Sequence, residues 1–218
     1  MRHFTLELDE LRKLLLQMGG AVESAVHRSV RSLMDRDEAV ARRVLEAEAS
    51  INQMEIDIDR MATRLLVLQQ PMARDLRFLT SVLKINADLE RMGDLAKNTA
   101  LRTLALLKLP PVKLNIDIPH MSSLVESMLL KSLDAFVKED SDLAQEVLMA
   151  DEEVDRVRST AYGEIVAHMQ MHPADVQSGV EMIFVVRNLE RIGDHATNIA
   201  EDVIFMSKGI DVRHHART

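Results

Sequence analysis

Apolar residues recur at alternating steps of four and three residues through a long stretch of the chain. The series runs through Val40, Val44, Ala47, Ile51, Met54, Ile58, Met61, Leu65 and Leu68. This spacing places every member on one face of an α-helix, and a strand, with its two-residue period, could not use it. A second series with the same spacing runs from Leu143 to Ala161. The pattern restricts the chain to long amphipathic helices that bury one face along their length.

Helix-breaking residues divide the chain into six predicted helices. Only seven glycines and five prolines occur in 218 residues, and good helix formers fill the intervals between them. Three prolines between residues 108 and 120 exclude a helix there and favour an extended linker. The predicted helices span residues 5–34, 38–69, 72–107, 120–138, 141–169 and 174–207.

The two halves of the chain are copies of each other. The segment "LERMGDLAKN" at 89–98 returns as "LERIGDHATN" at 189–198, and "ARRVLEAE" from residue 41 is matched by "AQEVLMAD" from residue 144. A repeat this long is not the short period of a solenoid. The sequence therefore predicts an all-α fold of two tandem three-helix bundles related by internal duplication. The predicted parts are a first repeat at 1–108, a proline-rich linker at 109–119 and a second repeat at 120–218.

Acidic and amide side chains occupy equivalent faces in both halves. Residues four apart share a helix face, which joins Glu90, Asp94 and Asn98 in the first half. The same stripe recurs in the second half as Glu190, Asp194 and Asn198. The preceding helix of each half adds Glu48 and Asn52 in the first, and Asp151 and Asp155 in the second. If these helices pack side by side, the acids repel one another unless protons or cations intervene.

A bound cation is the simplest way to offset this repulsion. The chain has no cysteine, so a metal must be held by oxygen or imidazole. Carboxylates and amides suit Mg, Mn, Fe, Zn or Ca ions, and bridging carboxylates hold more than one ion. Gly93 and Gly193, inside the acidic motifs, are expected to let another backbone or a bulky cluster approach. The alternative is a structural bundle that binds no metal, with the acids paired to neighbours such as Arg91 or Lys97.

Composition and spacing weigh against several other classes of protein. A net charge of −8 and 3% aromatic residues argue against nucleic-acid binding. The N-terminal segment is too charged for a signal peptide and no apolar run is long enough to cross a bilayer, so a cytoplasmic protein is expected. A carboxylate-bridged di-metal enzyme in a helical bundle is the rival function. It would need Glu-x-x-His on two helices, whereas Glu164 and His168 are four apart and occur once.

Three histidines of the second half, His168, His172 and His195, have no counterpart in the first half. They could assist a metal site, but a histidine at the surface or at an interface is the simpler interpretation.

The two repeats closely resemble the PhoU family of phosphate-transport regulators. The similarity covers essentially the whole chain. It is carried by "QQPMARDLRFLTSVLKINADLERMGDLAKN" in the first half and "HPADVQSGVEMIFVVRNLERIGDHATN" in the second. The family's metal motif, a Glu or Asp followed four residues on by Asp, matches Glu90 with Asp94, Glu190 with Asp194, and Asp151 with Asp155. The remaining pair, Glu48 and Asn52, departs from it and leaves the first site one carboxylate short.

The resemblance implies a cytoplasmic regulator that is not an enzyme and is commonly a homodimer. Such proteins act at the inner face of the phosphate-specific ABC transporter, where the ATPase subunit is an expected partner. They relay the state of the transporter to a sensor histidine kinase, which keeps the phosphate regulon off when phosphate is plentiful. Membrane contact is then expected only peripherally, through these partners.

Overall fold

The computed structural model describes residues 2–213 and contains no strand in this range. The first half comprises α1 (Arg2–Met34), α2 (Glu38–Gln69) and α3 (Ala73–Leu106). The second comprises α4 (Ile118–Lys138), α5 (Ser141–Met171), the short 3₁₀ helix η1 (Pro173–Asp175) and α6 (Val176–Lys208). The prediction of an all-α fold with three long helices in each half is confirmed. Residues 214–218 of the predicted second repeat lie outside the described range.

Aspartates begin several helices where the sequence turns. The Asp37 carboxylate accepts a hydrogen bond from the Val40 backbone N–H, and Asp140 accepts from two backbone N–H groups at the start of α5. Asp117 caps α4 in the same way, with Pro119 in the first turn. This cap explains why α4 begins at residue 118, two residues before its predicted start.

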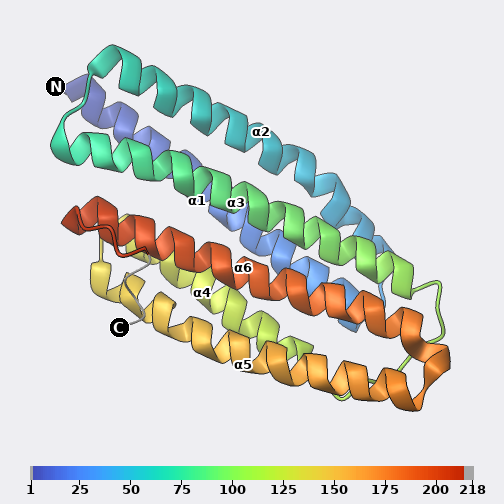
Figure 1. The fold of residues 1–218 in the computed structure, drawn as a ribbon. Coiled ribbons are helices and arrows are strands. Elements are labelled where there is room, and N and C mark those ends of the chain that lie inside the picture. The colour runs from blue at the N-terminus through green and yellow to red at the C-terminus, as the bar shows by residue number, and fades with distance from the viewer. Residues whose placement is uncertain (1, 214–218) are drawn as a thin grey trace.

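The two halves pack along two helix pairs, α3 with α6 and α1 with α4 (Figure 1). By contrast, α2 contacts only helices of the first half and α5 only elements of the second, so these two lie at the outer edges. The predicted pair of bundles therefore forms one six-helix assembly. One continuous cluster of buried apolar side chains runs through both halves.

Helices α3 and α6 run antiparallel, and polar side chains cross between them. Lys84 Nζ lies 2.8 Å from Asp202 Oδ1 near one end, and Arg102 Nη1 lies 3.3 Å from Glu181 Oε2 near the other. Between them, Asn188 donates to the Thr99 hydroxyl at 3.3 Å. Residue numbers therefore increase along α3 in the direction in which they decrease along α6. The two copies of the acidic motif consequently come to about the same level, on opposite sides of this interface.

An aromatic and charged cluster joins α1, α3 and α4. The rings of Phe78 and Phe136 are stacked with centroids 5.9 Å apart, and the Arg12 guanidinium lies 5.1 Å and 5.8 Å from them. Arg12 also donates to a Glu139 carboxylate oxygen at 3.2 Å. Although burial would raise it, hydrogen bonds from Arg74 and Arg12 lower the pKa of the Glu139 carboxyl. The cluster ties the two halves together at this end of the assembly.

Candidate functional site

Four carboxylates of the second half form an acidic seam between α5 and α6. We call Asp151, Asp155, Glu190 and Asp194 the second seam. Burial, and then repulsion from Asp194, Asp155 and Glu190, raises the pKa of the Asp151 carboxyl to about 6. Burial and Glu190 likewise raise the pKa of Asp194. The structure thus brings these four predicted residues close enough to disfavour the ionisation of Asp151 and Asp194.

A cation of the chain itself enters the second seam. Arg158 of α5 donates from Nη1 to Glu190 Oε1 at 2.6 Å, and its Nη2 lies 3.2 Å from Asp155 Oδ1. Arg158 was not among the predicted site residues. Its position three residues after Asp155 indicates that the two side chains can pair on one helix. Its contact with Glu190, however, depends on how α5 and α6 are aligned. One guanidinium among four carboxylates leaves the seam with an excess of negative charge.

The first half holds an equivalent seam between α2 and α3. We call Glu48, Glu55, Glu90 and Asp94 the first seam. Burial, followed by Asp94 and more weakly by Glu55 and Glu48, raises the pKa of Glu90. The predicted facing of acidic stripes across each pair of helices is therefore seen in both halves. Glu55 joins the seam in place of a carboxylate at Asn52, which is half-buried one turn earlier.

A basic side chain, Lys97, lies in the first seam. Its ammonium pairs with Glu48 on the neighbouring helix. This hydrogen bond raises the pKa of Lys97. At the equivalent place in the second half, the Thr197 hydroxyl donates to the Asp194 backbone oxygen at 2.7 Å. The first seam therefore carries two basic side chains, Lys97 beside Glu48 and Arg91 with its Nε 3.5 Å from Glu90 Oε2, whereas Arg158 enters the second.

The amides of the predicted ligand set occupy different surroundings. Asn98 is half-buried at the end of the first stripe. Asn198 instead donates to Asp88 Oδ1 at 3.2 Å, on the other half of the molecule. Asp88 also accepts from His195 Nδ1 at 2.8 Å, so His195 is an interface histidine, as expected. His168 lies 2.8 Å from Asp175, at the turn before α6. In the structure, Asn198 and His195 thus serve the contact between halves.

The chemistry of the second seam fits a hard cation, since its excess carboxylates are oxygen donors with raised pKa values. Among residues 2–213, however, no three His, Asp or Glu side chains are gathered tightly enough to hold one ion. A cation would need these side chains to move and would compete with Arg158 for Glu190. The first seam fits less well, because Lys97 already neutralises Glu48.

We predict that Asp151 makes the metal-free protein less stable as the pH rises. Its pKa of about 6 in the fold lies above the ordinary 3.8, so the fold disfavours the ionised form. Stability contributed by this group is present below about pH 4 and is lost as the pH rises towards about 6. After a discount for solvent screening, the loss should be about 1–2 kcal/mol. Urea unfolding of chelator-treated protein from pH 4.5 to 7.5, compared with Asp151→Asn, measures it; identical pH profiles would contradict the prediction.

Gly93 and Gly193 serve helix packing. A Cβ atom on Gly93 would meet Ile51 Cγ2 at 3.2 Å and Cδ1 at 3.3 Å. On Gly193 it would meet Val154 and Met128 at 3.6 Å and 3.8 Å. The expectation that these glycines admit a metal cluster or another backbone is wrong, because apolar side chains of neighbouring helices fill the space.

This difference predicts opposite outcomes for two matched alanine substitutions. Gly193→Ala meets only ordinary contacts and should raise the free energy of unfolding by about 0.5–1 kcal/mol through helix propensity. Gly93→Ala should gain nothing or lose stability, because buried Ile51 must shift. Urea unfolding of both variants at one pH tests the pair, and an equal gain in both would show that contact with Ile51 does not matter.

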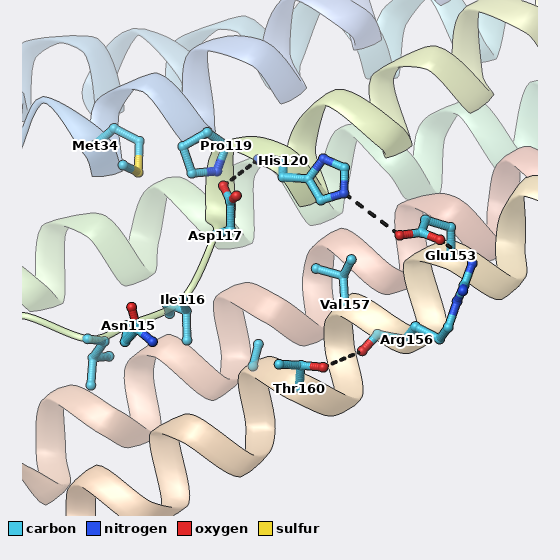
Figure 2. A pocket seen from close by; sticks show the side chains of 12 residues that line it. Met34, Asn115, Ile116, Asp117, Pro119, His120, Glu153, Arg156, Val157 and Thr160 are labelled. Atoms are coloured by element: carbon cyan, nitrogen blue, oxygen red, sulfur yellow. Dashed lines mark hydrogen bonds and ion pairs between the residues drawn. The ribbon is translucent and has the colours of Figure 1, made fainter.

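A separate cleft of about 710 Å³ lies at the end of the molecule that carries the linker. Figure 2 shows linker residues Asn115 and Ile116 on one side and Val157 and Thr160 of α5 on the other. His120 and Glu153 meet at the rim, 3.9 Å apart. This cleft was not predicted from the sequence, because it depends on where the linker lies against α5.

No helix within residues 2–213 combines the length and the apolar character needed to cross a bilayer.

Comparison of the sequence with known proteins identifies a matching family profile and several similar proteins. The sequence profile described as "PhoU domain" matches twice, at residues 15–103 and 118–203. The "Phosphate-specific transport system accessory protein PhoU homolog" of Pseudomonas aeruginosa is 42% identical over 98% of this chain and 88% of its own length. The homologue of that name from Aquifex aeolicus is 35% identical over 95% of this chain and 94% of its own length.

Two solved structures share the fold. The crystal structure of PhoU from P. aeruginosa superposes with a TM-score of 0.92 at 41% identity, covering 95% of this chain and 100% of that chain. The phosphate transport system regulatory protein PhoU from Streptococcus pneumoniae gives a TM-score of 0.89 at 30% identity, with 96% and 99% covered.

Proposed function

The chain belongs to the PhoU family, and from this membership we propose that it is an accessory regulator of phosphate transport. The observation that carries the proposal is the full-length similarity, which spans both repeats at 42% identity to a protein named for that role. Relatives named as accessory and regulatory proteins favour a role without catalysis.

We propose more specifically that the protein is a cytoplasmic homodimer. It acts as an adaptor between the ATPase subunit of the phosphate ABC transporter and a sensor histidine kinase. It holds the phosphate regulon off when phosphate is plentiful. A rigid six-helix assembly with long exposed helix faces suits such a role, since helix faces are common docking surfaces.

The experiment for this role is affinity capture of the tagged full chain from phosphate-replete and phosphate-starved cells of its host. The transporter ATPase and the kinase should be retained, in amounts that differ between the two conditions. Recovery of neither protein under either condition would refute the adaptor role.

We further propose that the second seam binds a divalent cation. Asp151, Asp155, Glu190 and Asp194 would hold it, and Asn52, Asn98, Glu48, Glu90 and Asp94 mark the weaker site of the first seam. A bound ion would supply the positive charge that Arg158 alone does not, and so hold α5 against α6.

Metal analysis of protein purified without chelator tests this proposal. Asp151→Asn/Asp194→Asn should remove the metal of the second seam, whereas Glu48→Gln/Asp94→Asn should remove little, because Lys97 already occupies the first seam. Lys97→Thr, which copies the second-half residue, should increase metal binding by the first seam. Unchanged metal content in all three variants would show that the seams are not the site.

A further inference from the structure

The linker between α3 and α4 has the pattern of a β-strand, although no strand pairs with it. Exposure alternates residue by residue along it. Val112, Leu114 and Ile116 are half-buried, while Lys113 and Asn115 are exposed. Apolar side chains at every second position are typical of a strand with one covered face. Here the covered face lies on the end of the helical assembly.

The backbone of this segment has free hydrogen-bonding groups. Within the described residues, no N–H or C=O group from Val112 to Ile116 makes a hydrogen bond. The two flanks are fixed. Arg36 donates to the Leu109 carbonyl at 3.3 Å, and the Asp117 side chain and carbonyl accept from the first turn of α4. The result is an extended backbone, anchored at both ends, that presents donors and acceptors at strand spacing.

One edge of the segment borders the cleft shown in Figure 2. Met34, Ile116, Val157 and Ala161 give the cleft apolar lining, and Thr160 lies on the α5 side. The charged residues at the rim satisfy each other, because Glu153 pairs with Arg156. The cleft therefore offers backbone groups and apolar surface, and little unpaired charge.

We propose that this cleft binds an extended peptide segment of a partner protein, which adds a strand beside residues 114–116, the part of the segment that lines the cleft. Free main-chain donors and acceptors at strand spacing are complementary to another extended backbone. The apolar lining would take alternate side chains of the peptide. Three paired residues at roughly 3.3 Å each span about 10 Å. The inference goes beyond the proposed regulatory role and does not depend on metal in either seam.

A library of displayed heptapeptides with apolar residues fixed at alternate positions is the probe, selected against the full chain. A selected peptide is then titrated by fluorescence anisotropy against three variants. Thr160→Trp fills the cleft and should abolish binding. Ser159→Trp is the matched control, since Ser159 is exposed on the same helix and does not line the cleft. It should bind like the original chain.

Two proline substitutions test main-chain pairing. Leu114→Pro and Asn115→Pro each remove one N–H, and successive N–H groups of a strand point to opposite edges. The linker already contains prolines and the backbone of residues 112–116 makes no hydrogen bond within the described part of the chain, so both variants should keep the fold. Leu114→Pro also removes a half-buried side chain that packs on the core, so its melting temperature should fall further than that of Asn115→Pro. The variant on the cleft edge should weaken binding about tenfold and the other less than twofold.

The outcomes separate clearly. Selective loss in Thr160→Trp and in one proline variant supports the proposal. It is overturned if no library member binds, if bound peptides are insensitive to Thr160→Trp, or if both proline variants behave alike. A dimer in light scattering that Thr160→Trp dissociates would also overturn it, because a second copy of the chain would then be the occupant.

Discussion

Phe136→Ala is expected to lower the free energy of unfolding by about 3–5 kcal/mol. The Phe136 ring is fully buried on α4 and stacks on Phe78 of α3, under the Arg12 guanidinium. Its removal leaves a cavity where the two halves meet, and surrounding helices can close it only in part. Urea unfolding followed by circular dichroism gives the change, with the slope of the transition reporting whether both halves still unfold together.

Phe184→Ala is the matched control for this substitution. Phe184 is also an aromatic residue under an arginine, with Arg102 4.7 Å from the ring centroid, but Phe184 is 37% exposed, whereas Phe136 is fully buried. Its loss should cost about 1–2 kcal/mol, less than the loss of Phe136. Equal effects of the two substitutions would show that the buried aromatic stack does not hold the halves together.

Lys84→Met is expected to lower the free energy of unfolding by about 2 kcal/mol at pH 8. The substitution leaves the Asp202 carboxylate, 8% exposed, without its partner inside the α3–α6 interface. The expected cost is below that of breaking a fully buried pair, because the Lys84 side chain is 40% exposed. Lys131→Met, which breaks the exposed pair with Glu146, should change stability by less than about 0.5 kcal/mol.

The pH dependence of the Lys84→Met variant has a definite sign. Burial already raises the pKa of Asp202, and Lys84 opposes that shift. Without Lys84 the pKa rises further, so the fold binds a proton that the unfolded chain has released. The penalty should therefore be largest above the new pKa and should shrink as the pH falls through it. Unfolding at pH 5 and pH 8 tests this, and an equal penalty at both would contradict it.

Local patterns were sufficient to predict the secondary structure and the duplication. The four-three spacing of apolar residues and the helix-breaking prolines act within a few residues of sequence, so their signal is contiguous. The acidic stripes could be predicted for the same reason, because each lies on one helix. Their facing across a helix pair followed from the short turns within each half.

Contacts between helices could not be predicted from the spacing of residues along each helix. Lys97 pairs with Glu48 and Arg158 with Glu190 because of the alignment of neighbouring helices, and a shift of one turn would select other partners. The role of Gly93 was misjudged for the same reason, since Ile51 approaches it from another helix. The packing of α3 on α6 was likewise not predicted, because both carry apolar residues on more than one face.

The antiparallel packing of the halves bears on how the gene could be rearranged. Helix α1 begins and α6 ends at one end of the assembly, and the linker lies at the opposite end (Figure 1). A circular permutant that starts at Ile118, with the original termini joined by a short flexible peptide, would exchange the order of the halves and keep every helix pair in place. Such a permutant should fold. The fold would then not require this order of the two halves along the polypeptide, and the order would reflect the ancestry of the gene.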